Sequence, residues 1–494
     1  MDAVCINQDD TRERDQQVQL MRDVYSKACV VHIWLGCGDR SITSGMQRFI
    51  SEGTMQAHEN DYLCRLPWYV SCQRSFTPYL KHSLISIVRF ARFHRLWVVQ
   101  EACLARNPEA HYGSVKVPFW RLIERIREVG QSLRGYTIEA SAAFMSESLS
   151  KYHDIDSGTR ITEIGDLFGT CRDAARRGTE FLEVLYDLRH CDFTVAHDRV
   201  YAALGLAPKD LDLYPRYTSS IAEVFEETTL AVIRQSQNLD VLLFAGTDRA
   251  GSLELPSWTA DFQHMDRNLL FRPNSFRPHR RPGIPLAPAS CHRTVEGLHL
   301  QGFIVDQVTD SHAIPCNVPD MKWTDYESYG VLRPGLRRAQ RHVLDAIDST
   351  NNPKPQPHKA QHAIQCAFWC SLTAQDEPEF APQYQTWLDD ESASSACLER
   401  YHFAPERLHH CSTNATIIIT REGRICASFK SRIQPGDCLA VMPGANAPFI
   451  LRPQGEPSSR TYQLVAPCYS YGRCIMSHSI RVSRRLIPSF TQAS

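Results

Sequence analysis

The stretch DAVCINQDDTRERDQQVQLMRDVYSKACVVHIWLG, residues 2–36, decides the fold class. The apolar run Ala3–Ile6 and the β-branched, aromatic run 29–36 each predict a buried strand. Between them, Asp9 or Asp10 can cap a helix, whose apolar residues recur at steps of three and four as Val18, Met21, Tyr25 and Ala28. This order predicts a right-handed βαβ unit with parallel strands.

A candidate pocket follows from this arrangement, because ligands of open parallel sheets bind beyond the carboxyl ends of the strands. The first strand ends at Asn7-Gln8 and the second at Gly36, so these residues are predicted to share one rim. The next segment, GCGDRS, differs from the dinucleotide-binding pattern GxGxxG by a serine at position 41. We interpret it as a Gly-rich turn before a helix near 41–52.

The segment 82–108 is predicted to be helical, either continuous or broken near Arg92, and contains RLWVVQEACLA. Trp97 and Glu101 are four residues apart and therefore share one helix face. Burial beside an indole raises the pKa of a carboxyl group and suits it to acid or base chemistry. The alternative is a surface glutamate with its tryptophan in the core. Glu101 is the candidate catalytic residue, with Arg95, Trp97 and Gln100 beside it on the rim.

Composition restricts the possible functions of the 494-residue chain. Its net charge of -1 gives no reason to expect nucleic acid as a partner, and no apolar run is long enough to span a bilayer. The 18 cysteines form no CxxC pair and are interpreted as reduced thiols of a cytoplasmic chain. The spacing of histidines and cysteines fits no standard zinc motif, so neither a metal site nor a bound cofactor is predicted.

The carboxyl-terminal part changes from helical to strand periodicity. Helices are predicted within 218–246, at 335–348, 362–373 and 378–389, and a strand at 298–308. TIIITREGRICASF, residues 416–429, predicts a hairpin around Glu422-Gly423, and further turns are expected at 435–437 and 443–444. Short strands at regular spacing predict a small β-barrel.

Four sequence blocks resemble the heterokaryon incompatibility (HET) domain family of filamentous fungi. The first runs from Cys5-Ile6-Asn7-Gln8 to Trp34-Leu35-Gly36, and the second is RxWxxQE at Arg95–Glu101. The third, HDRVYAALGLAP, contains Asp198, Arg199, Tyr201, Gly205 and Leu206, and the fourth is LPSWTADF at 255–262. The carboxyl-terminal strands are also similar to the barrel of some HET proteins.

This resemblance implies a fold and a function. HET domains are similar to the TIR fold, a flavodoxin-like α/β sandwich, and some TIR domains cleave NAD with a helix glutamate that Glu101 would match. Family members normally begin with a strand of the type ALSYxWG, so the resemblance implies either a misassigned start site or a truncated paralogue that has lost part of the site. It also implies fungal non-self recognition and programmed cell death, with other proteins, or a second copy, as partners. The alternative is a TIR-like hydrolase with NAD as substrate and Glu101 as its carboxylate.

The predicted fold class is therefore α/β, an incomplete TIR-like parallel sheet followed by a mostly helical region and a small carboxyl-terminal β-barrel. The predicted divisions are a truncated HET domain at 1–115, a helical region at 116–264, an Arg/Pro-rich linker at 265–292, a mixed segment at 293–350, a linker at 351–361, and helices with the barrel at 362–484.

Overall fold

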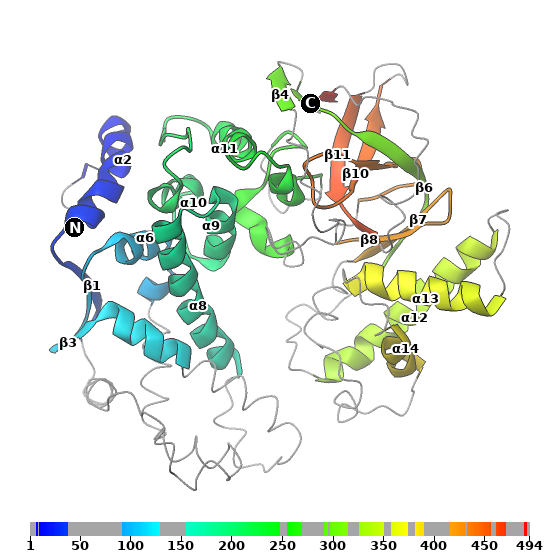
Figure 1. The fold of residues 1–494 in the computed structure, drawn as a ribbon, viewed down its shortest axis with the longest axis horizontal. Helices are drawn as coiled ribbons and strands as arrows, with labels where there is room; N and C mark the ends of the chain where they lie inside the picture. Colours follow the sequence, from blue (N-terminus) through cyan, green and yellow to red (C-terminus); the bar gives the residue numbers. More distant parts are fainter. Residues whose placement is uncertain are drawn as a thin grey trace, which may run out of the picture. The chain divides into compact units, whose positions relative to one another are not determined.

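The computed structural model divides the chain into two units, Met1–Ser220 and Ile221–Ser494 (Figure 1). The residues that it describes are 6–7, 9–37, 91–128, 155–247, 254–268, 291–294, 297–314, 326–349, 357–373, 381–389, 415–429, 432–455, 461–470 and 489–491.

The first unit begins with helix α2, Thr11–Lys27, as the sequence predicted. Asp10 caps it: its Oδ1 accepts hydrogen bonds from the backbone nitrogens of Arg12, at 2.9 Å, and Glu13, at 3.2 Å. These bonds satisfy amides that have no partner within the helix. Met21 is the residue of this helix that is fully buried.

A three-stranded sheet follows, in the order β1, β2, β3. Strand β1, Val31–Gly36, pairs in parallel with β2, Pro108–Tyr112. Strand β2 pairs antiparallel with β3, Val115–Pro118. The described sheet is thus small and mixed. The predicted neighbour of β1 lies mostly outside the described residues, and Ile6, its last residue, is in a bend.

The helix predicted at 82–108 is described from residue 91 onward, where it is interrupted at Arg95. Ala91–His94 forms a 3-10 turn, η2, and α6 covers Leu96–Leu104. The prediction was wrong at its carboxyl end, where Pro108 starts strand β2. Proline lacks the amide hydrogen that a helix interior requires but is tolerated at the start of a strand.

Helices build the rest of the first unit as far as its residues are described. They are a helix at 119–128, α8 at Ile155–Arg177, α9 at Phe181–Asp187 and α10 at Asp198–Tyr201, with 3-10 turns η4 at Leu188–His190 and η5 at Leu204–Leu206. Phe119 and Phe168 meet edge to face with ring centroids 5.1 Å apart, and Phe93 lies 6.1 Å from Phe168. This aromatic core holds α8 against the segment that precedes α6.

The second unit starts with the predicted helix α11, Ile221–Ser236, and continues with 3-10 turns η6, Asp240–Phe244, and η7, Phe262–Asn268. Between these turns lies the fourth sequence block, 255–262. Trp258 is buried in it, and the amide of Ala260 donates to Thr229 Oγ1 on α11 at 3.1 Å. The block therefore serves the core of the second unit.

The carboxyl-terminal strands form a ten-stranded sheet in the order β12-β8-β7-β6-β9-β10-β11-β13-β5-β4. The strands are β4 at Cys291–Thr294, β5 at Gly297–Leu300, β6 at Phe303–Ala313, β7 at Thr416–Thr420, β8 at Ile425–Ser428, β9 at Cys438–Val441, β10 at Phe449–Gln454, β11 at Thr461–Pro467, β12 at Tyr469–Ser470 and β13 at Ser489–Thr491. Only the β11–β13 pair of this set is parallel.

This sheet corrects the predicted barrel. Among the described strands, β12 and β4 end the order and no pairing joins them, so the sheet is open. The long strand β6 pairs with β9 along its first part and with β7 along its second, with a register shift in each pairing. Such irregularities bend a strand, and β6 joins the β9 side of the sheet to the β7 side. The hairpin at Glu422-Gly423 is confirmed between β7 and β8.

Three helices cover β7 and β8: α12 at Tyr326–Ser349, α13 at Pro357–Thr373 and α14 at Ala381–Asp389 (Figure 1). Their core contains Trp369 and Trp387 together with Ile417 and Ile425 from the strands. The three helical predictions are confirmed, although α12 starts before residue 335 and α13 starts inside the stretch predicted as a linker. No helix in the described ranges combines the length and apolarity needed to cross a membrane.

A buried ion pair gives the first testable prediction. Asp437 is buried, and its carboxylate accepts from Arg452 Nε at 2.8 Å and Nη2 at 2.9 Å. Replacement Arg452→Met leaves that charge unpaired, so we expect unfolding free energy to fall by about 3–5 kcal/mol in urea titrations. The double variant with Asp437→Asn should lose less than Arg452→Met alone. Equal losses in both would contradict this explanation.

Candidate functional site

Helix α6 places the residues of the RxWxxQE block. Arg95 precedes it, is exposed, and forms an isolated parallel bridge with Asp192, in which the amide of Leu96 donates to Asp192 O at 3.0 Å. Trp97 and Glu101 lie one helical turn apart, and both are half-buried. The helix therefore has the spacing that the sequence predicted, and the catalytic role of Glu101 stays a prediction.

Gln100 points into the protein and meets the third sequence block. Its side chain is 2% exposed and lies against Gly205 in η5. A Cβ atom added at Gly205 would lie 2.5 Å from Gln100 Cδ and 2.8 Å from Cγ, and nearer still to Nε2. Only glycine permits this approach. The close packing of Gln100 against Gly205 thus accounts for both residues in the two sequence blocks.

The other predicted rim residues are placed as follows. Asn7 is exposed and lies at the start of α2, where its Oδ1 accepts from the amide of Asp9 at 3.2 Å and its own amide donates to Glu13 Oε1 at 3.3 Å. Gln8 lies outside the described residues. Gly36 ends β1 with φ of 147°, and its carbonyl accepts from the amide of Gly113 at 3.0 Å. A rim shared by these residues stays a prediction.

A cluster around Tyr217 ties the first block to the third. The Tyr217 hydroxyl donates to Asp198 Oδ1 at 2.6 Å, and its backbone amide donates to Asp15 Oδ1 at 2.8 Å. The Arg14 guanidinium lies 3.8 Å from the centroid of the Tyr217 ring, a cation–π contact. Burial, together with the Asp198 charge, raises the pKa of Tyr217, so the phenol remains a hydrogen-bond donor. Arg14, Asp15 and Asp198 therefore have structural roles here.

A pocket lies between α2 and the segment that follows η5. Its two cations are Arg22, which donates to Ala207 O at 2.9 Å, and Lys209. Its lining is Arg22, Asp23, Leu204, Ala207, Pro208, Lys209, Leu211 and Leu213. Glu101 is not part of this lining, so the candidate carboxylate and this pocket are separate features.

The described cysteines are free thiols, in agreement with the sequence analysis. Burial raises the pKa of Cys191 to about 12 and that of Cys438 to about 11. Because the thiolate is the reactive form, these two residues are poor nucleophiles at neutral pH.

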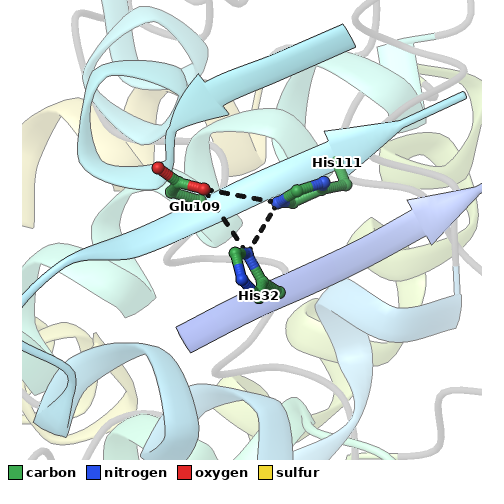
Figure 2. Close-up of side chains that lie close together, drawn as sticks. All are labelled: His32, Glu109 and His111. Atoms are coloured by element: carbon green, nitrogen blue, oxygen red, sulfur yellow. Dashed lines mark hydrogen bonds and ion pairs between the residues drawn. The ribbon is translucent and has the colours of Figure 1, made fainter. Parts of the chain in front are cut away.

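Strands β1 and β2 bring together a set of side chains that the sequence analysis missed (Figure 2). His32 and Glu109 are register partners on the paired strands, and His111 lies two residues beyond Glu109 on the same face. His32 Nδ1 lies 2.8 Å from His111 Nε2 and 3.4 Å from Glu109 Oε2. Glu109 Oε2 lies 3.5 Å from His111 Nε2. One ligating atom of each side chain thus points to a common centre.

Local spacing could not reveal this cluster, because His32 and His111 are 79 residues apart. The available signal was the alternation of side chains along each strand. His32 and Trp34 alternate with the buried residues of β1, and Glu109 and His111 alternate with the buried residues of β2. Recognising it required the β1–β2 pairing, for which the sequence offered a different partner strand.

The contact of Gly205 with Gln100 gives the second prediction. In Gly205→Ala the new methyl group displaces the buried Gln100 side chain, so we expect unfolding free energy to fall by about 1–3 kcal/mol. Adding Gln100→Ala removes the clash, and the double variant should lose less than the sum of the single losses in thermal or urea unfolding.

Gly169→Ala is the matched control, because its Cβ would have only an ordinary contact, 3.8 Å from Arg127 Nη1. This change inside α8 should leave stability unchanged or raise it by up to about 1 kcal/mol. Additive losses at Gly205 and Gln100 would show that the two side chains do not compete for the same space.

Comparisons with known proteins agree with the motif analysis. Residues 1–101 match the family model described as heterokaryon incompatibility protein (HET). The chain is 25% identical over 364 residues to heterokaryon incompatibility protein 6, OR allele, of Neurospora crassa, across 63% of this chain and 51% of that protein. The chain thus spans about half the length of this curated relative, and no solved structure gives a significant match. The resemblance to the heterokaryon incompatibility family is confirmed for the amino-terminal part of the chain.

Proposed function

We propose that this protein acts in fungal non-self recognition as a signalling or interaction protein of the heterokaryon incompatibility response, leading to programmed cell death. The observation that carries the proposal is the family match over residues 1–101 together with the similarity to heterokaryon incompatibility protein 6. The structure supports a non-catalytic role for several motif residues, because Arg14, Asp198, Gln100 and Gly205 are engaged in packing.

The outward face of α2 is the surface that we propose for recognition. Leu20 and Val24 are one helical turn apart and are 49% and 55% exposed, which is unusual for two large apolar neighbours. The opposite side of the helix is fixed by Asp15 and Arg22, which bind the segment around Tyr217 and Ala207. A rigidly held helix with an exposed apolar pair is suited to contact with another protein.

A second copy of this chain is the partner that the charges favour. Asp23 and Lys27 flank Val24 and pair with each other at 2.8 Å while both stay well exposed. Such a surface pair contributes little within one helix, so the two charges can instead cross to an antiparallel copy of α2. The near-neutral net charge of -1 also imposes no repulsion between copies.

Substitution of Val24 tests this function. Induced expression of the chain in a filamentous fungal host should arrest growth, and Val24→Glu should relieve the arrest and reduce co-precipitation of two differently tagged copies by at least about tenfold. The change places a charge in an apolar contact. Because position 24 is exposed, the chain should still fold, which circular dichroism can verify.

Gln19→Glu is the control, since Gln19 is an exposed polar residue of the same helix. It should arrest growth like the unaltered chain. Full growth arrest by Val24→Glu at equal expression would overturn the role of this face. Absence of arrest with the unaltered chain would overturn the proposed function.

NAD cleavage by Glu101 is the competing function, and it rests on the resemblance to TIR domains alone. Incubation of the purified protein with NAD, with nicotinamide followed by chromatography, separates the two. We expect the unaltered chain to release no more nicotinamide than Glu101→Gln. Release by the unaltered chain that disappears in Glu101→Gln would instead establish the hydrolase.

A further inference from the structure

We propose that His32, Glu109 and His111 form a binding site for a divalent first-row transition-metal ion, and we expect that ion to be zinc. Two imidazole nitrogens and one carboxylate oxygen are a donor set typical of zinc sites that keep a coordination position open. This site is independent of the α2 face and of Glu101.

The distances between the donor atoms fit a shared ion. Ligands bound to one zinc ion at about 2.0–2.1 Å in a tetrahedral arrangement lie roughly 3.3 Å apart. The two separations that involve Glu109 Oε2 are 3.4 and 3.5 Å. The two histidine nitrogens are 2.8 Å apart, so a shift of about half an ångström between the rings completes the tetrahedral spacing.

The alternative arrangement is a hydrogen bond between the two neutral imidazoles. It uses one proton between His32 Nδ1 and His111 Nε2 and leaves the carboxylate oxygen at 3.4–3.5 Å from both nitrogens, beyond the usual length of a charge-assisted hydrogen bond. An ion placed between the three atoms contacts all of them. Its binding moves that proton to solvent or to another ring nitrogen.

The strand pairing places the three donor residues side by side before an ion binds. The opposite face of the two strands is buried through Val31, Ile33, Ala110 and Tyr112, which fixes the strand pairing and hence the positions of His32 and Glu109 as partners. Figure 2 shows the three side chains converging above the two strands. When the donors are already close together, ordering them on metal binding costs little free energy.

Solvent can reach the site. The exposed fractions of the side chains fall from 60% for His32 to 38% for Glu109 and 14% for His111. An ion can therefore enter from the outer face of the sheet, and water or a partner's side chain can take the fourth position. Lys116 is the register partner of His111 and is exposed, and its positive charge opposes the ion.

Zinc binding to the full chain tests the proposal. In equilibrium dialysis with a zinc salt, His32→Ala, Glu109→Gln and His111→Ala should each lose one equivalent of zinc relative to the unaltered chain, with the affinity for that equivalent falling more than about tenfold. Counting the lost equivalent separates this site from zinc held by thiols elsewhere. Lys116→Gln should keep the equivalent and bind it at least as tightly.

His292→Asn is the matched control. His292 and His299 stack across β4 and β5 with ring centroids 4.7 Å apart, and His292 is exposed like His32. It should bind as much zinc as the unaltered chain. Equal zinc content in the three site variants and in the unaltered chain would overturn the proposal.

Trp34 supplies an independent readout, because it is the register partner of His111 and is 44% exposed. Cobalt bound in place of zinc should quench part of the tryptophan fluorescence, and both Trp34→Phe and His111→Ala should remove that part. Quenching that is unchanged in both Trp34→Phe and His111→Ala would locate the bound cobalt elsewhere and contradict the assignment. Circular dichroism of each variant confirms that the fold is retained.

Discussion

The close contact between α6 and the turn at Gly205 is the constraint on which the first unit depends. The Gln100 side chain occupies the space that any other residue at position 205 would need. Because α2 contacts both α6 and this turn, and Asp15 and Arg22 bind the same segment of chain, the three sequence blocks meet at one centre. Several residues of the three sequence blocks are therefore those that pack the first unit together.

The second unit depends on a different interaction, in which buried aspartate carboxylates are paired with arginine or hydrogen-bonded to an amide. Asp437 is held by Arg452, Asp306 by Arg424 at 2.8 Å, and the buried Asp240 accepts from the amide of Asn446 at 3.1 Å. Asp306 and Arg424 are 118 residues apart and Asp240 and Asn446 are 206 apart, whereas Asp437 and Arg452 are 15 residues apart. Buried carboxylates are costly unless they are paired or hydrogen-bonded, so these contacts stabilise the arrangement of the segments that they join.

Local signals predicted the elements that local interactions determine. Asp10 and the charge of Glu13 located the start of α2, and Gly423, with φ of 76°, located the β7–β8 hairpin. The partner of β1 could not be found in this way, because β2 is distant from β1 in the sequence and local signals do not show which strands pair. Barrel closure failed for a related reason: it depends on whether the end strands β12 and β4 pair, which is a long-range contact that local signals do not show.

The same limit applies to the candidate sites. The four-residue spacing of Trp97 and Glu101 and the buried position of Gln100 follow from one helix, and the first of these was predictable. The side chains of His32, Glu109 and His111 converge only once two distant strands are paired, so a search for contiguous metal-binding patterns does not find them. In this chain the chemistry-bearing groups that sequence reasoning misses are those brought together by long-range topology.

The parallel pairing of β1 with β2 has a consequence for the kinetics of folding. His32 and His111 meet across 79 residues, so the entropy of closing that long loop is lost before the pairing contributes any favourable contact. Hairpins such as β2–β3 and β7–β8 close over a few residues and form far sooner. The amino-terminal strand of the first sheet is thus expected to join late, and until then the unpaired backbone edge of β2 is accessible to other chains.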